Sequence, residues 1–76
     1  MTIHVRFFAS LREQIGIRSK EVDAEGLHNV RDLWAFLTKE PLDDTTLIAI
    51  NKTYSGPESR VKDGDEVAFF PPITGG

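Results

Sequence analysis

The sequence predicts a single two-layer α+β domain in which one main helix packs across one mixed sheet. The chain has 76 residues, a length that favours one domain. Short runs near both ends are alternately apolar and polar, or continuously apolar, as strands are. One central segment instead repeats its apolar residues with the spacing of a helix.

The first strand is predicted over Thr2–Phe8, where the apolar residues alternate with polar ones. Ile3, Val5 and Phe7 fall on one face of such a strand. The other face is polar, and Phe8 breaks the pattern by placing an aromatic ring there. We therefore expect a half-buried strand with one unusual aromatic residue at its end.

A short helix and a second strand are expected next. Ser10 is a suitable N-cap for the helix, and Gly16 is suited to end it. Leu11 and Ile15 lie four residues apart and so share a helix face. The segment Arg18–Ala24 has a weaker pattern, but its short spacing favours a strand paired with the first one.

The main helix is predicted to begin after Asn29, which is a good N-cap. A hydrophobic stripe with helical spacing follows, with Phe36 on its flank. The stripe consists of Val30, Leu33, Trp34 and Leu37. Pro41 cannot continue a helix, so the helix is expected to end near Lys39 or Glu40.

Three further strands are predicted in the second half of the chain. A buried strand is expected at Thr46–Asn51, and a short strand between two turns is expected within residues 51–59. A turn at Asp63–Gly64 leads into a last strand at Glu66–Phe70. Strand pairing should stop at Pro71–Pro72, because proline has no N–H to donate. If the first and last strands pair in the middle of the sheet, the fold is a β-grasp, ubiquitin-like roll.

Size and composition restrict the function. A domain this short has a core worth only about 3–5 kcal/mol and little room for an enclosed active site, which favours a carrier, modifier or subunit. The absence of cysteine excludes disulfides and thiol chemistry, and two histidines give no support to a metal site. A net charge of −3 disfavours nucleic acid and favours a partner with a basic docking face. Neither a membrane span nor a signal peptide is expected.

The last residues, "FFPPITGG" (69–76), suggest a functional tail. A Gly75-Gly76 end can enter a channel too narrow for side chains, and a partner with ATP could activate the Gly76 carboxylate as an acyl-adenylate. Pro71 and Pro72 hold the root of the tail extended, which lowers the entropy lost on insertion. Fully extended, the tail reaches about 20 Å. The alternative is a frayed terminus without a role.

Three segments together resemble the family of molybdopterin synthase small subunits, the MoaD type of ubiquitin-like sulfur carriers. They are "VRFFASLRE" (Val5–Glu13), "LIAIN" (Leu47–Asn51) and "DGDEVAFFPPITGG" (Asp63–Gly76). The resemblance covers nearly the whole chain. Thiamin-pathway carriers share "DGD" before the last strand, but they usually lack the double aromatic and double proline.

The resemblance implies a reaction cycle centred on Gly76. An E1-like adenylyltransferase uses ATP to adenylylate the Gly76 carboxylate, so a nucleotide is carried on the C-terminus for part of the cycle. A sulfurtransferase or cysteine desulfurase system then converts it to a thiocarboxylate. The tail inserts into the large subunit of molybdopterin synthase, and the sulfur passes to cyclic pyranopterin monophosphate. Two such transfers build the dithiolene of molybdopterin during molybdenum cofactor biosynthesis.

The resemblance also implies the general character of the protein. The chain would be one cytoplasmic domain, residues 1–76, with a flexible C-terminal tail at residues 71–76. It would bind no cofactor itself and would form a heterotetramer with the large subunit. It would act as a sulfur donor while the large subunit supplies the catalytic groups, so its standing as an enzyme is left open.

Partner contacts are expected on the exposed face of the sheet and along the tail, as in the family. Alternation places Phe7 and Phe69 in the core and leaves Phe8 and Phe70 for a partner, although any one of the four could be core. Arg12 could pair with an acidic group of the partner or stay solvated. The expected partner-binding residues are Phe8, Arg12, Phe70, Pro71, Pro72, Ile73 and Thr74.

Three alternative functions remain open at this point. The chain could carry sulfur for thiamin synthesis or tRNA thiolation. It could be a protein modifier that is joined to lysines through Gly76, as ubiquitin is. It could also be a binding module whose tail is inert, in which case deletion of Gly75 and Gly76 would leave its function intact.

Overall fold

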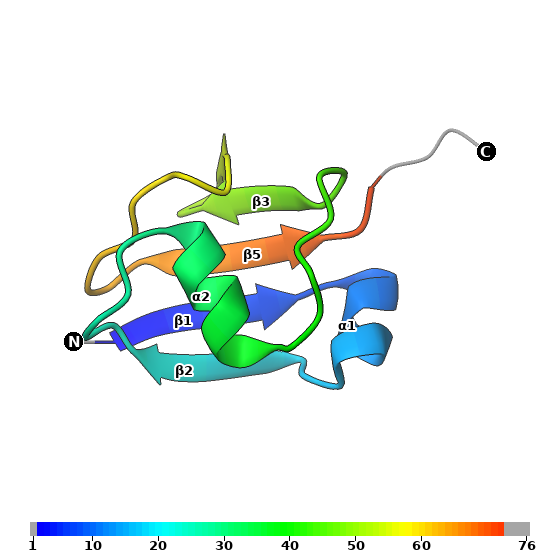
Figure 1. Ribbon diagram of the computed structural model, residues 1–76, viewed down its shortest axis with the longest axis horizontal. Helices are drawn as coiled ribbons and strands as arrows, with labels where there is room; N and C mark the ends of the chain where they lie inside the picture. The colour runs from blue at the N-terminus through cyan, green and yellow to red at the C-terminus, as the bar shows by residue number, and fades with distance from the viewer. Residues whose placement is uncertain (1, 73–76) are drawn as a thin grey trace.

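The computed structural model describes residues 2–72, which form a five-stranded sheet with two helices. Helix α2 lies across one face of the sheet, and α1 lies at the end from which the chain leaves β5 (Figure 1). The elements in chain order are β1 (Thr2–Phe7), α1 (Ala9–Ile15), β2 (Ser19–Asp23), α2 (Val30–Leu37), β3 (Leu47–Ile50), β4 (Thr53–Ser55) and β5 (Glu66–Phe70).

The sheet has the strand order β2-β1-β5-β3-β4. The first and last strands pair in parallel at its centre, with a register that runs from His4 opposite Glu66 to Phe7 opposite Phe69. The other three strand pairs are antiparallel. The predicted mixed sheet with central pairing of the first and last strands is therefore confirmed.

The core lies between the sheet and α2, and aromatic rings fill its centre. Phe7 and Phe69 are stacked with ring centroids 5.3 Å apart, and Trp34 meets Phe69 edge-on at 5.0 Å. All three side chains are almost completely buried. Aromatic pairs in these geometries contribute beyond their buried area, so the end of the sheet next to the tail is firmly packed.

Helix α2 begins as predicted, because the Asn29 side chain caps it. Asn29 Oδ1 accepts a hydrogen bond of 2.9 Å from the backbone N–H of Asp32, which satisfies one of the free donors of the first turn. The Asp32 carboxylate also lies favourably near the positive end of the helix dipole. This cap holds the helix start against the loop before β5, where the backbone N–H of Val30 donates to the carbonyl oxygen of Ser59.

The predicted helix end near Lys39 or Glu40 was wrong, because α2 ends at Leu37. Thr38 already has extended backbone angles. The Trp34 indole N–H donates to the carbonyl oxygen of Glu40 at 2.7 Å. A buried indole needs such an acceptor, and the chain leaves the helix early to supply it.

The start of α1 also differs from the prediction. The helix begins at Ala9 after an extended Phe8, and Ser10 lies inside it instead of capping it. Ala9 has a φ of +52°, a left-handed conformation that costs most residues about 1–2 kcal/mol. The predicted end is confirmed, since Gly16 is left-handed and its N–H donates to the Arg12 carbonyl oxygen.

A buried carboxylate anchors the start of β5. Asp65 is 3% exposed, and its two oxygens accept hydrogen bonds of 2.9 Å from the Asn51 side-chain amide and the Lys62 backbone N–H. Asn51 Oδ1 in turn accepts from the Glu66 N–H. The turn between β3 and β4 and the loop before β5 are thus tied together, which fixes the strand that leads to the tail.

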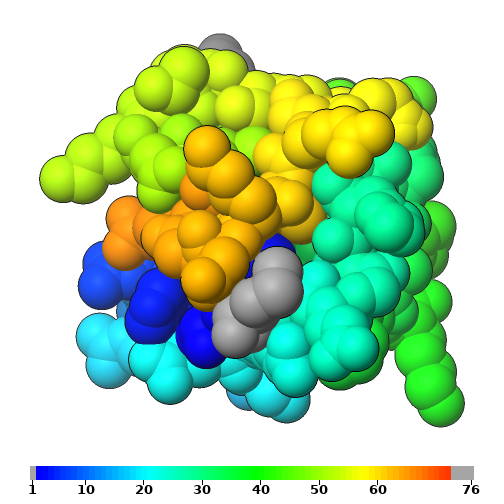
Figure 2. All heavy atoms as spheres, turned by 90° about the vertical axis from the view of Figure 1, so that its left-hand side faces the viewer, coloured from blue at the N-terminus to red at the C-terminus, as the bar shows by residue number. Residues whose placement is uncertain are grey.

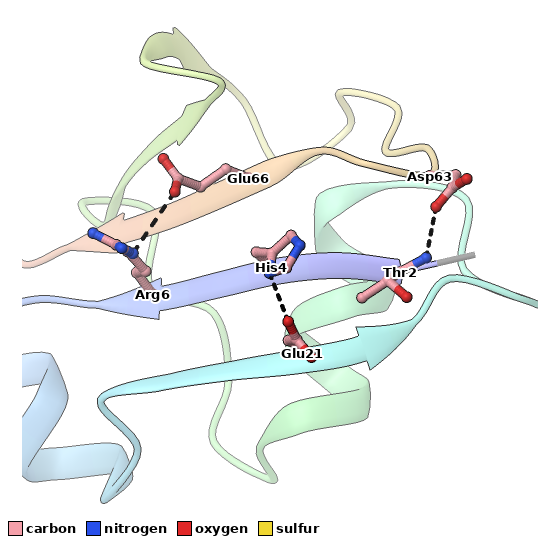
Figure 3. A network of polar contacts seen from close by, with 6 residues as sticks. All are labelled: Thr2, His4, Arg6, Glu21, Asp63 and Glu66. Carbon is pink, nitrogen blue, oxygen red and sulfur yellow. Dashed lines mark hydrogen bonds and ion pairs between the residues drawn. The ribbon is translucent and has the colours of Figure 1, made fainter.

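The outer face of the sheet carries charged side chains around β1 (Figure 3). His4 Nδ1 lies 3.3 Å from Glu21 Oε1, and Arg6 Nε lies 3.7 Å from Glu66 Oε2. Exposed pairs of this kind contribute little stability. No helix within residues 2–72 is long and apolar enough to cross a membrane.

Candidate functional site: the surface at the root of the tail

The root of the tail leaves β5 next to the end of β1. Because the two strands are parallel, both end at the same edge of the sheet, and the Phe8 backbone N–H still donates to the Phe69 carbonyl oxygen at 3.1 Å. Strand β5 ends at Phe70, and Pro71 and Pro72 follow without pairing, as predicted. The predictions for Ile73, Thr74, Gly75 and Gly76 lie outside the described residues.

Phe8 and Phe70 form a stacked pair on the outer face of the sheet. Their ring centroids are 4.6 Å apart and their planes differ by 10°. Both side chains are partly exposed, whereas Phe7 and Phe69 are 1% and 0% exposed. The predicted division of the four rings between core and outer face is confirmed.

A surface pocket of about 250 Å³ lies beside this stacked pair. Its lining is mostly apolar and includes the root of the tail. The lining residues are Phe8, Ala9, Leu47, Tyr54, Phe70, Pro71 and Pro72. We call these seven residues the aromatic docking surface, because exposed apolar patches are typical of protein interaction sites.

Tyr54 belongs to this surface and was missed in the sequence analysis. Its side chain is 73% exposed. Tyr54 lies opposite Ala49, and Ala49 lies opposite Ala68, so all three share the outer face of the sheet. Only the register of β4 against β3 reveals this position, and the sequence pattern of so short a strand does not define that register.

Arg12 lies beside the aromatic docking surface on α1. Its guanidinium Nε donates a hydrogen bond of 3.4 Å to the carbonyl oxygen of Phe7. This bond holds the long side chain near Phe8, the residue that leads into α1. The structure thus places Arg12 close to Phe8, and among residues 2–72 its guanidinium has no ion-pair partner.

A smaller pocket of about 140 Å³ lies on the other side of the tail root. Its lining includes Trp34, Pro71 and Asp43. Hydrogen bonds from the backbone and hydroxyl of Thr45 to Asp43 lower the pKa of this carboxyl. Trp34 is the only tryptophan of the chain, so its fluorescence can report on events at the tail root.

Within residues 2–72, no three histidine, aspartate or glutamate side chains gather to hold a metal ion. The docking surface itself contains no carboxylate and no imidazole. This geometry can present the root of the tail, Pro71 and Pro72, to a partner. The fold and the site define a ubiquitin-like β-grasp protein that offers its C-terminal segment beside an aromatic docking surface.

Comparison with known proteins shows the family. The model of the ThiS family matches residues 5–76, and the chain belongs to this family. It is 41% identical to the molybdopterin synthase sulfur carrier subunit of Escherichia coli, across 97% of this chain and 99% of that protein. It is 40% identical to the protein of the same name from Haemophilus influenzae, with the same coverage.

Solved structures confirm the ubiquitin-like β-grasp fold. Small archaeal modifier protein 1 from Haloferax volcanii matches with a TM-score of 0.78 and 26% identity, across 95% of this chain and 98% of that one. A chain in the complex of subunits 1 and 2 of molybdopterin-converting factor from Helicobacter pylori matches with a TM-score of 0.66 and 26% identity, across 100% of both chains.

Proposed function

We propose that this chain is the sulfur carrier subunit of a molybdopterin synthase and that its tail docks into the large subunit. One observation carries the proposal. The stacked Phe8–Phe70 pair lies beside the root of the tail, and the ThiS family model matches the chain through the end of this tail at residue 76. The full-length likeness to two sulfur carrier subunits supports the same function. The Helicobacter pylori complex of two subunits supports a large-subunit partner.

The proposed chemistry takes place at the Gly76 carboxylate. In an E1-like adenylyltransferase, a carboxylate oxygen attacks the α-phosphorus of ATP and pyrophosphate leaves. The sulfur of a persulfide donor then attacks the acyl carbon, AMP leaves, and a thiol reductant releases the thiocarboxylate. In the large subunit the thiocarboxylate sulfur then attacks a carbon of cyclic pyranopterin monophosphate, and an oxygen substituent leaves that carbon. Water hydrolyses the resulting acyl thioester, which leaves the sulfur on the substrate and returns the tail as a carboxylate. Because every round consumes ATP, we place the cycle in the cytoplasm.

The chain acts as a tethered reagent in this cycle. The rigid end of the sheet, with Phe7, Phe69 and Trp34 in contact, fixes where the tail starts. The aromatic docking surface then supplies binding energy to a partner without taking part in the reaction. The catalytic acid and base belong to the large subunit in this scheme, since the docking surface has none.

The first test is intact mass spectrometry of the protein after incubation with a cognate E1-like enzyme, ATP and a sulfur source. The expected result is a mass gain equal to the exchange of one oxygen for sulfur. A variant lacking Gly75 and Gly76 is the control and should gain nothing. Addition of the large subunit and cyclic pyranopterin monophosphate should then return the original mass. A loaded carrier that keeps its sulfur at this step would refute the molybdopterin assignment and favour thiamin or tRNA thiolation.

A second candidate function is protein modification, which the likeness to small archaeal modifier protein 1 favours. In that case the activated Gly76 would be captured by a lysine amine and form an isopeptide bond. Cells expressing the tagged protein would contain a ladder of conjugates that disappears when Gly75 and Gly76 are deleted. A pure sulfur carrier gives no such ladder.

A further inference from the structure

Another surface pocket, of about 370 Å³, adjoins the aromatic docking surface. Its lining combines residues from β1, α1 and the start of β2, and every charged residue among them is an arginine. The lining residues are Arg6, Phe7, Phe8, Arg12, Arg18 and Ser19. We call this the arginine pocket.

The positive charge of the arginine pocket is largely uncompensated. Within residues 2–72, Arg18 has no ion-pair partner, and the Arg12 guanidinium bonds only to the Phe7 carbonyl oxygen. Arg6 pairs with Glu66, but at the long distance of 3.7 Å and with both side chains well exposed (Figure 3). The net charge of −3 led to the expectation of a basic partner face, yet the region beside the tail root has the opposite sign.

The position of the pocket favours a protein over a small anion as its ligand. Phe8 lines both the arginine pocket and the aromatic docking surface, so a protein that covers Phe8 also reaches the arginines. Arg6 and Arg18 are exposed, one on β1 and the other in the loop before β2, whereas a small-anion site usually has fixed, convergent donors. Guanidinium groups suit carboxylates in particular, because they form paired hydrogen bonds with them.

We propose that the arginine pocket receives carboxylate side chains of the large subunit and thereby accelerates the encounter that precedes tail insertion. This inference rests on the proposed function. Complementary charges raise association rates above those of neutral surfaces, and salt screens the effect. The apolar contacts at Phe8 and Phe70 then hold the complex, while the arginines set how fast it forms and how salt affects it.

A matched pair of double variants tests this division of roles. Arg6→Gln/Arg18→Gln removes two charges from the pocket, of which one is in an ion pair with Glu66. Arg31→Gln/Arg60→Gln also removes two charges, one of them paired with Glu58 at 3.3 Å. These control positions belong to the start of α2 and to the loop before β5. Both segments lie away from α1 (Figure 1), and Figure 2 views the molecule from their side.

The measurement is stopped-flow association with the cognate large subunit in buffers from low to high NaCl concentration. For the unmodified chain, the rate constant should fall about tenfold from the lowest to the highest salt. The pocket variant should associate about fivefold more slowly at low salt and lose most of the salt dependence, whereas the control should stay within about twofold. If the pocket variant does not fold, Arg18→Gln against Arg60→Gln gives the same comparison with smaller effects.

Each outcome decides one claim. Equal rates for the two double variants, or association that does not depend on salt, would overturn this inference and leave the proposed function standing. No complex between the unmodified chain and the large subunit would overturn the proposed function and this inference with it. A stoichiometric site for inorganic phosphate that is lost in Arg6→Gln/Arg18→Gln, with salt-independent association, would assign the pocket to a small anion instead.

Discussion

Truncation of Phe8 should weaken partner binding far more than it weakens the fold. The Phe8→Ala variant loses the stack with Phe70, in which the ring centroids are 4.6 Å apart, and such a stack is worth about 0.5–1.5 kcal/mol. Phe8 is only partly buried, so little cavity forms. The expected loss of stability is therefore about 1–2 kcal/mol. By contrast, Phe7→Ala removes a ring that is 1% exposed and should cost about 3–5 kcal/mol.

The effect on binding has a different scale. An aromatic residue at the centre of an interface typically contributes about 2 kcal/mol or more, so Phe8→Ala should raise the Kd for the large subunit about 30-fold. Urea unfolding and isothermal titration calorimetry measure the two quantities separately. The control is Phe36→Ala, since Phe36 is also an exposed aromatic residue, 63% exposed, but lies on α2. Phe8→Ala with an unchanged Kd, or Phe36→Ala with a raised one, would refute the assignment of the docking surface.

Three further predictions concern the framework that supports the tail. Asp65→Ala leaves the Asn51 amide and the Lys62 N–H without their acceptor and should lower the free energy of unfolding, measured in urea, by about 2–4 kcal/mol. A decrease below about 0.5 kcal/mol would contradict the anchoring role. Lys52→Gly should raise the free energy of unfolding by about 0.5–1 kcal/mol. Lys52 has a φ of +71° in a two-residue hairpin turn, where Asn-Gly is preferred because glycine adopts positive φ without strain. Lys52→Ala is the control and should bring no gain. Hydrogen bonds from Thr45 lower the pKa of Asp43 in the folded protein. The ionised Asp43 carboxylate therefore stabilises the fold at pH values above its unfolded pKa of about 3.9, and this stabilisation is lost as the pH falls through the folded pKa. The stability difference between the unmodified chain and Asp43→Asn should therefore shrink on acidification, and a difference that does not change with pH would be evidence against this hydrogen bonding.

Most of the framework could be predicted from local patterns. Alternation over Thr2–Phe8 correctly separated Phe7 from Phe8, because the side chains of a strand point to opposite faces by geometry alone. Pro71 marked the end of β5 for an equally local reason, the missing N–H. The Asn29 cap was also predictable, since it depends on one side chain and the turn that follows it.

The differences come from contacts that no local pattern contains. The end of α2 at Leu37 depends on the bond between the Trp34 indole and the Glu40 carbonyl, a tertiary requirement that overrides helix propensity. Tyr54 joins the docking surface only through the pairing of β4 with β3. In the same way, Arg6 and Arg18 are separated in the sequence, and the pairing of Arg6 with Ser19 brings the loop residue Arg18 beside β1, so the arginine pocket had no sequence signature.

The central position of β5 has a mechanical consequence for a protein that works by its tail. A partner that holds the tail pulls along the axis of β5, which is bonded to β1 on one side and to β3 on the other. Such a force shears both ladders at once, whereas an edge strand can be peeled away one hydrogen bond at a time. In the proposed cycle, the domain would therefore stay folded while a partner draws it in by its tail and while it is released again.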